Sequence, residues 1–240
     1  MKVIIVNDTN ELGREALAQI LKVVKQNPSA TLGLATGSTP LPLYNAIIAD
    51  HKENGTSYKN IKTFNLDEYV GLDSSHPQSY IKFMRDNLFD HIDIDLKNVN
   101  IPNGLSDNIP NECKRYSTLL SKNSIDIQIL GIGSNGHIAF NEPNTPFDSL
   151  THQVKLTQKT ICDNARFFNN INEVPTSALT MGIGEIMRAK TILMLATGAG
   201  KANAVYEMIK GKVDVSCPAS VLQNHKNTIV IIDKAAASKL

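Results

Sequence analysis

The chain has 240 residues, a formal net charge of +1 and 42% hydrophobic residues. This length predicts one sizeable core or at most two small ones. The near-neutral charge, without a basic cluster, argues against a nucleic-acid surface, and no apolar run approaches membrane-span length. The first apolar run is too short for a signal peptide, and Asp8 follows it at once. We therefore expect a cytoplasmic protein with neither nucleic-acid nor membrane partners.

Apolar strand patterns alternate with helical patterns along the chain. The expected strands are Val3–Val6, Thr31–Ala35, Ile61–Leu66, Ile125–Leu130, Gln153–Thr157, Thr191–Ala196 and Thr228–Ile232. The expected helices are Asn10–Lys25, Leu41–Lys52, Ser79–Phe89, Asn111–Lys122 and Lys201–Ile209. This alternation predicts an α/β fold with an open, mostly parallel sheet and helices on both faces. No linker or low-complexity tract divides the chain, so we expect a single domain over residues 1–240.

Two of the expected strands end in similar loops. Leu34-Ala35-Thr36-Gly37 leads into Ser38-Thr39-Pro40, and Leu195-Ala196-Thr197-Gly198 leads into Ala199-Gly200-Lys201. Each loop precedes a helical pattern, where free backbone N–H groups and the positive end of the helix dipole suit a phosphate. The Lys201 ammonium adds a point charge suited to the same anion. Either loop alone is equally compatible with a plain helix cap, but two in one parallel sheet favour an anion site.

A third strand exit carries Asp67 and Glu68 within Phe64-Asn65-Leu66-Asp67-Glu68-Tyr69. Adjacent residues of an extended segment point to opposite sides, so at most one of these acids faces a crevice at the strand ends. The pair alone favours an ordinary polar strand end. Arg166, which lies beside two aromatic residues, is either an exposed charge or a group held to grip an anion.

The loop from Gly131 to Pro143 is the most informative segment. It follows an apolar strand and contains three glycines, Asn135, His137 and Glu142. Catalytic groups in open α/β sheets gather at the carboxyl ends of the strands. A histidine closely followed by a carboxylate is a common acid/base arrangement, because the carboxylate orients the ring and stabilises its cation.

The same loop spells G-x-G-x-x-G, which in a dinucleotide-binding protein opens directly into a helix. Here Asn141-Glu142-Pro143-Asn144-Thr145-Pro146 disfavours a helix, because two prolines lie close together. The next expected strand, Gln153–Thr157, has no acidic residue at its end. The context therefore argues against a nicotinamide cofactor.

Cysteines and histidines give no metal-binding pattern. Cys113, Cys162 and Cys217 are odd in number, widely spaced and without a C-x-x-C pair, which suits a reducing compartment. The histidines show no H-E-x-x-H pattern, and no cysteine lies near them at ligand spacing. We expect no metal site.

Together these loops closely resemble one family, the glucosamine-6-phosphate deaminases, over nearly the whole chain. The matching segments are Gly33–Pro40, Phe64–Tyr69, Gly136–Pro143, Ala165–Phe168 and Gly200–Ala202. The resemblance implies a modified Rossmann-like fold. It also implies conversion of D-glucosamine 6-phosphate and water to D-fructose 6-phosphate and ammonia, without metal or organic cofactor.

The resemblance also assigns roles to these residues. His137, with Glu142 and Asn135, would open the sugar ring, and Asp67 would move the proton between C2 and C1. The phosphate would be held by the loop of Thr36, Gly37, Ser38 and Thr39, together with Arg166 and Lys201. These groups supply binding energy that positions the reacting carbons.

Two features depart from the better-known long members of the family. Those members carry aspartate where this chain has Asn135, and an amide cannot neutralise an imidazolium, so Glu142 would carry more of that task. The C-terminal extension of the allosteric hexamers is also missing after Ile229–Asp233. We therefore expect a monomer, with a dimer as the alternative, and hyperbolic kinetics without activation by N-acetylglucosamine 6-phosphate.

Two other functions share this architecture. A 6-phosphogluconolactonase also uses a Gly-His loop, but Asn141-Glu142-Pro143 and Asp67-Glu68-Tyr69 favour the deaminase. Sugar-phosphate-sensing regulators carry a DNA-binding helix-turn-helix, for which the chain has no room before Val3. The presence of both Asp67 and His137 also favours an enzyme.

Overall fold

The computed structural model describes residues 1–165, 168 and 170–240, and a seven-stranded sheet forms its centre. The strand order is β1-β10-β9-β6-β2-β3-β5, and all neighbouring pairs are parallel. These strands are β1 (Lys2–Val6), β2 (Thr31–Leu34), β3 (Lys62–Asn65), β5 (Val99–Asn100), β6 (Ile127–Leu130), β9 (Ile192–Ala196) and β10 (Thr228–Asp233). From β2 the chain adds strands in one direction, and from β6 it adds them in the other. The winding therefore reverses between β2 and β6, where open α/β sheets bind their ligands.

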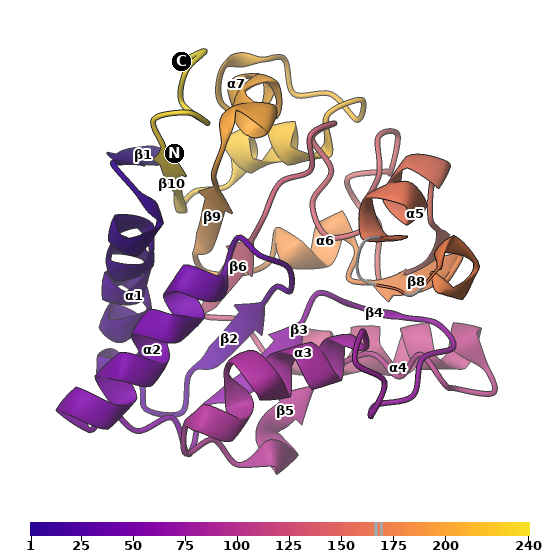
Figure 1. Cartoon of the computed structure of the whole chain (residues 1–240), viewed down its shortest axis with the longest axis horizontal. Helices are drawn as coiled ribbons and strands as arrows, with labels where there is room; N and C mark the ends of the chain where they lie inside the picture. Colours follow the sequence, from indigo (N-terminus) through magenta and orange to yellow (C-terminus); the bar gives the residue numbers. More distant parts are fainter. Residues whose placement is uncertain (166–167, 169) are drawn as a thin grey trace.

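Helices cover both faces of this sheet, which confirms the predicted α/β class. In Figure 1, α2 and α3 lie in front of the sheet and α4 lies behind it. The α-helices are α1 (Thr9–Gln26), α2 (Leu41–Asn54), α3 (Tyr80–Asn87), α4 (Ile109–Lys122), α5 (Gln158–Ala165), α6 (Ile183–Ile186) and α7 (Ala202–Lys210). The 3-10 helices are η1 (Phe89–His91), η2 (Leu96–Asn98), η3 (Ile171–Glu173), η4 (Ala199–Lys201) and η5 (Pro218–Asn224).

Local sequence accounts for most of these elements. All five residues of β9 are apolar and buried, as expected of a central parallel strand that is covered on both faces. At the start of α1, the Asp8 carboxylate accepts a hydrogen bond from the Glu11 N–H and satisfies one of the free donors there. At the end of α2, Gly55 adopts a left-handed conformation and stops the helix.

A second, three-stranded sheet changes the predicted strand arrangement. It consists of β4 (Asp67–Tyr69), β8 (Ser177–Thr180) and β7 (His152–Lys155) in the order β4-β8-β7, with antiparallel pairing throughout. The strand predicted at Gln153–Thr157 therefore forms, shifted by one residue at its start, but lies outside the parallel sheet. Its residues are alternately half-buried and exposed, which suits an edge strand with one face open to solvent.

The main core lies between the central sheet and its helices, and a smaller cluster lies against the second sheet. The smaller cluster contains Tyr69, Phe140, Leu156 and Ala178. Within the described part of the chain, no helix is long and apolar enough to cross a membrane. The three cysteines are all free.

Candidate active site

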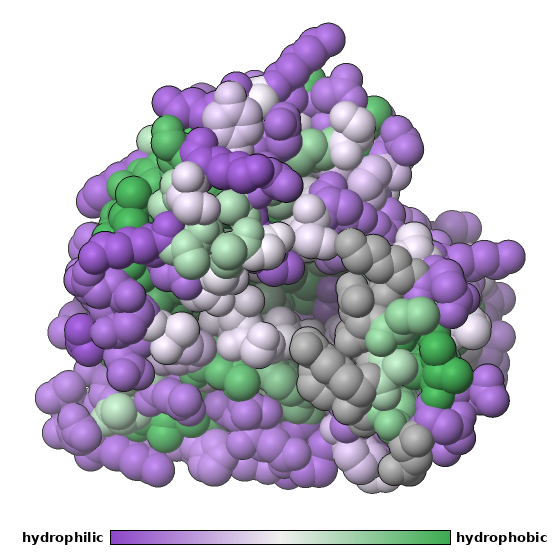
Figure 2. Space-filling model, turned by 45° about the horizontal axis from the view of Figure 1, so that its top comes forward, coloured by the Kyte–Doolittle hydropathy of each residue, from purple (hydrophilic) through white to green (hydrophobic). Residues whose placement is uncertain are grey.

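Four adjacent strands of the central sheet deliver the predicted site residues to one edge. In the order β9-β6-β2-β3, their carboxyl ends lead to Lys201, to the His137 loop, to residues 36–39 and to Asp67. These exits flank the point between β2 and β6 where the winding reverses. Figure 2, which tilts this edge forward, shows a hollow near the centre of the molecule. The sheet thus brings together residues that lie far apart in the sequence.

Asp67 begins β4, immediately after the chain leaves β3. Its side chain is buried, and the burial raises the pKa of its carboxyl group to about 8, with the neighbouring Glu68 charge as a further cause. A carboxyl group with such a pKa binds a proton far more tightly than an exposed one. This is the property expected of a carboxylate that removes and returns protons near neutral pH.

Glu68, on the opposite side of β4 from Asp67, has a structural role. Its carboxylate accepts hydrogen bonds from the N–H groups of Tyr69, Tyr80 and Ile81, at 2.8, 2.9 and 3.0 Å. Two of these donors begin α3, so Glu68 fixes the helix to the strand. Because alternate residues of a strand point to opposite sides, Asp67 faces away from this contact. Glu68 also lines a separate cavity of about 440 Å³ beside α3 and β5.

The His137 loop holds its three polar groups within contact of one another. The Asn135 amide donates to Glu142 Oε2 at 2.7 Å, and Asn135 Oδ1 accepts from the His137 N–H at 3.2 Å. His137 Nδ1 lies 3.6 Å from the same Oε2 atom and is buried without a hydrogen-bond partner among the described residues. Gly133 provides space for the imidazole, since a Cβ atom there would come within 2.3 Å of the ring. The predicted histidine–carboxylate pair is therefore present.

The loop of residues 36–39 leads from β2 towards α2. Gly37 has φ 91°, a conformation that other residues adopt with strain, and nothing lies within 4 Å of the place its Cβ would occupy. Ser38 is exposed and Thr39 is half-buried. A hydrogen bond links Thr36 to the hydroxyl of Tyr80, whose pKa burial raises well above its ordinary value. The loop is thus open to a ligand on one side and anchored to α3 on the other.

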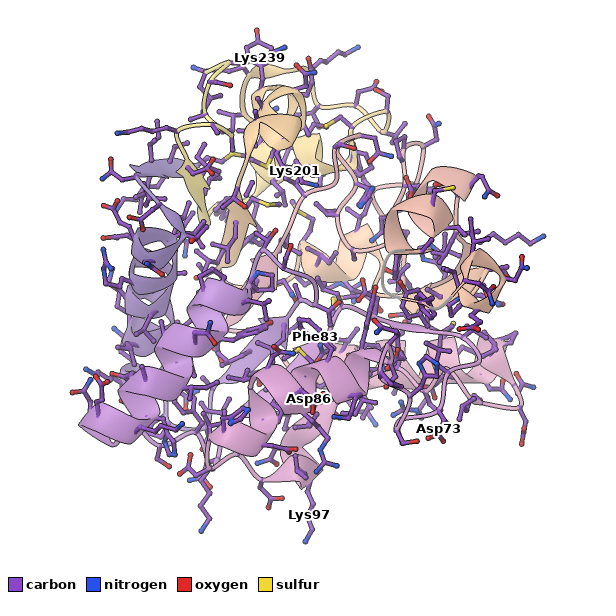
Figure 3. The ribbon with its side chains drawn as sticks, viewed as in Figure 1. Asp73, Phe83, Asp86, Lys97, Lys201 and Lys239 are labelled. Carbon is purple, nitrogen blue, oxygen red and sulfur yellow. The ribbon has the colours of Figure 1, made fainter. Side chains whose placement is uncertain are left out.

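The similar loop after β9 differs from this one in its backbone bonding. Gly198 also has a positive φ, 88°, but its N–H already donates to both carboxylate oxygens of Asp233, at 3.1 and 2.9 Å. The predicted supply of free N–H groups is therefore smaller here than after β2. Lys201 stands at the end of η4, where α7 begins, above the end of β9 (Figure 3). Arg166 lies outside the described residues.

An aromatic cluster beside Asp67 was not predicted. The ring centroids of Tyr69 and Tyr80 are 4.8 Å apart, and Phe140 lies 5.9 Å from Tyr69 and stacks on Tyr80 at 6.2 Å. Phe168 meets Tyr69 edge-on at 6.3 Å. These rings come from four separate segments, and the positions of Tyr69, Phe140 and Phe168 within the motifs were the only sequence signal that they lie near the site. They give the crevice an apolar wall beside its acidic group.

Among the described residues, no three His, Cys, Asp or Glu side chains gather into a group that would hold a metal ion. The site combines a buried carboxyl group, a histidine–carboxylate pair and a glycine loop near a helix start, all at one edge of a parallel sheet. This combination is typical of α/β enzymes that transfer protons on a small phosphorylated molecule.

Comparison with known proteins identifies the family. Residues 8–231 match the family of glucosamine-6-phosphate isomerases and 6-phosphogluconolactonases, and the chain belongs to it. A glucosamine-6-phosphate deaminase of Clostridium botulinum is 51% identical over all of this chain and 99% of its own length. The resemblance inferred from the motifs is confirmed.

Solved structures agree with this assignment. A structure described as a monomeric glucosamine-6-phosphate deaminase superposes with a TM-score of 0.97 at 45% identity, and each chain is covered completely. A 6-phosphogluconolactonase from Trypanosoma brucei superposes with a TM-score of 0.79 at 19% identity, covering 100% of this chain and 98% of its own. The second likeness concerns the fold alone.

Proposed function

We infer that this protein is an enzyme of amino-sugar catabolism that converts D-glucosamine 6-phosphate and water to D-fructose 6-phosphate and ammonia. Full-length identity of 51% to a deaminase carries this conclusion. The site supports it independently, because it offers one acid/base group for each proton-transfer stage that the reaction requires. We propose that residues 1–240 act as a single sugar-phosphate isomerase/deaminase domain.

The first stage is opening of the sugar ring. A proton must leave the anomeric hydroxyl, and a proton must reach the ring oxygen. His137 is the group that accepts the first and donates the second. Glu142 Oε2 lies 3.6 Å from the Nδ1 atom of this ring, where its carboxylate can orient the imidazole. Asn135 cannot supply a second negative charge, and its role is to hold Glu142 through the 2.7 Å hydrogen bond. The Glu142 carboxylate is therefore the group that would balance the charge of a protonated His137. Its position beside the ring nitrogen Nδ1 supports this role.

The second stage is isomerisation of the open chain. Asp67 removes the proton from C2 and returns a proton to C1, so the aldose becomes a ketose derivative. The nitrogen on C2 shares the electrons of the intermediate enolamine. After protonation at C1 the product is a ketimine, which adds water and releases ammonia. The pKa of about 8 makes Asp67 a stronger base than an exposed carboxylate.

The phosphate group lies at the other end of the sugar and positions it. Residues 36–39, Arg166 and Lys201 are the proposed contacts. Exposed Gly37 and Ser38 stand at the open side of their loop, close to the start of α2. Binding energy from this remote group holds C1 and C2 at the acid/base residues, where a near-attack geometry accelerates both stages.

Release of ammonia from purified protein tests the function directly. Ammonia and fructose 6-phosphate should appear in equal amounts from glucosamine 6-phosphate, and free glucosamine should be a very poor substrate. The matched control is Asp67→Asn, which keeps the shape of the side chain and removes its basicity. Hydrolysis of 6-phosphogluconolactone without any ammonia release from the amino sugar would show that the inferred reaction is wrong.

We also propose a monomer that acts in the cytoplasm and has no nucleic-acid partner. The similarity to a structure described as a monomeric deaminase supports the oligomeric state. Three free cysteines suit a reducing compartment, and a net charge of +1 gives no electrostatic attraction to nucleic acid.

A further inference from the structure

The end of β8 contacts both catalytic parts of the site. Thr180, the last residue of this strand, is completely buried. In the antiparallel register it stands opposite Asp67 of β4. Its hydroxyl oxygen accepts a hydrogen bond from the Phe140 N–H at 3.1 Å, and the hydroxyl is 3.4 Å from the Met181 carbonyl, to which it donates. Thr180 therefore lies next to the proposed base through its backbone and bonds to the loop of His137 and Glu142 through its side chain.

The loop at this contact has a conformation that needs external support. Residues 138–141 form a tight turn, in which the Asn141 N–H donates to the Ile138 carbonyl at 3.1 Å. Ala139 in this turn has φ 52°, a left-handed conformation that costs a non-glycine residue about 1 kcal/mol or more. Such a conformation persists only where its surroundings hold it.

A second hydrogen bond holds the same turn to Met181, the residue after β8. The buried Asn141 side chain donates to the Met181 carbonyl at 2.9 Å and to the Ile138 carbonyl at 3.0 Å. The Met181 N–H in turn donates to the carbonyl of Leu66, at 2.6 Å, immediately before Asp67. Thr180 therefore stands opposite Asp67, Met181 bonds to Leu66 just before it, and both residues bond to the 138–141 turn on the other side.

We propose that Thr180 is a positioning residue, whose hydroxyl sets the place of His137 and Glu142 relative to Asp67. This inference rests on the proposed roles of those three residues. Ring opening involves C1 and the ring oxygen, and isomerisation involves C1 and C2, so both acid/base systems act on neighbouring atoms of one sugar. Displacement of one system by about 1 Å is enough to lower turnover by as much as 10²-fold.

Three variants separate this role from general stability. Thr180→Val keeps the volume but removes the acceptor of the Phe140 N–H, whereas Thr180→Ser keeps the hydroxyl. The matched control is Thr63→Val, because Thr63 is also buried and its hydroxyl has no hydrogen-bond partner among the described residues. We expect Thr180→Val to lower kcat by about 10-fold or more, and Thr180→Ser and Thr63→Val to stay within about twofold of the parent.

Binding and hydrogen exchange supply readouts that reduced stability alone does not move. The acyclic probe 2-amino-2-deoxy-D-glucitol 6-phosphate has no ring to open, so Thr180→Val should bind it within about threefold of the parent. Amide exchange should accelerate in a peptide spanning residues 136–143 and not in β9 or β10. If Thr180→Val does not fold, Thr180→Ala removes the same acceptor with a smaller side chain.

Three results would overturn the proposal. These are parent-like kcat in Thr180→Val, an equal loss of kcat in Thr180→Ser, or uniformly faster exchange along the chain. Failure of the underlying assignment is distinguishable, because Asp67→Asn would then retain turnover whatever the Thr180 variants do. An inactive Asp67→Asn beside a fully active Thr180→Val would refute the positioning role alone.

Discussion

Replacing Asp67 with asparagine should abolish turnover and at the same time stabilise the protein at neutral pH. An amide has nearly the same shape as the carboxyl group but does not accept the C2 proton, and loss of a positioned base typically lowers the rate by 10²–10⁴-fold. Sugar-phosphate binding should be largely retained, because residues 36–39 and Lys201, which are proposed phosphate contacts, follow other strands than Asp67 does. Loss of activity would thus accompany a gain in stability, opposite to the effect of a damaging core substitution.

The size of the stability gain follows from the pKa of Asp67. Burial raises this pKa to about 8 in the folded protein, whereas an unfolded aspartate has a pKa of about 3.9. Below about pH 4 both states hold the proton, so the pKa difference has no effect there. Between about pH 4 and 8 the unfolded state releases its proton and the folded state retains it, so stability falls by up to about 1.4 kcal/mol per pH unit. At pH 7 the loss reaches about 4 kcal/mol as an upper limit, and asparagine avoids it.

Urea unfolding of both proteins at pH 4.5, 6.0 and 7.5 measures this effect. The difference in free energy of unfolding between Asp67→Asn and the parent should be small at pH 4.5 and should increase at each step. Asn65→Ala, which removes a buried polar side chain two residues away, is the control and should show no such trend. A difference that stays constant with pH would refute the reasoning about burial, and near-parent turnover would remove Asp67 from its catalytic role.

Other measurements test the remaining parts of the site. The kcat/KM for glucosamine 6-phosphate, corrected for titration of the substrate amine, should rise with pH up to about 8, because Asp67 acts as a base only when deprotonated; a flat profile from pH 6 to 8 would contradict this. Glu142→Gln should lower kcat by on the order of 10²-fold, whereas Asn135→Asp should remain active. A fully active Glu142→Gln beside an inactive Asn135→Asp would show that Glu142 does not supply the charge beside His137. Lys201→Ala should raise KM by roughly 10- to 150-fold, the equivalent of 1.5–3 kcal/mol for a charge-assisted phosphate contact, with a smaller fall in kcat; equal use of glucosamine with and without phosphate would oppose the assignment. Sedimentation at micromolar concentration should give a monomer, with hyperbolic kinetics that N-acetylglucosamine 6-phosphate leaves unchanged; a hexamer with sigmoidal kinetics would overturn this prediction.

The sequence by itself determined the main site segments and six strands of the central sheet, but not the two-residue strand β5. Strands such as Ile192–Ala196 are continuous apolar runs, and the helices between them begin and end with local capping signals. The positions of these elements can therefore be predicted from residues that are close together in the sequence. Parallel strands also present their carboxyl ends at one edge, so the His137 loop and the two glycine loops were expected there, whereas only the family resemblance assigned Asp67 to the same site. Their identification as one family site depended on several motifs occurring together in the right order.

Only the tertiary structure decided contacts between segments that are distant in the chain. Asp67 pairs with Thr180 across an antiparallel sheet. The three residues of β4 contain no local signal for this partner, because β8 lies far away in the sequence. The same pairing directs Glu68 to the start of α3 and Asp67 away from it, a choice that strand alternation alone left open. Asp233 bonding to Gly198 likewise joins the ends of two neighbouring strands. Local propensity determines where a strand begins and ends, but burial and hydrogen bonding with remote segments determine its partner and the face each side chain presents.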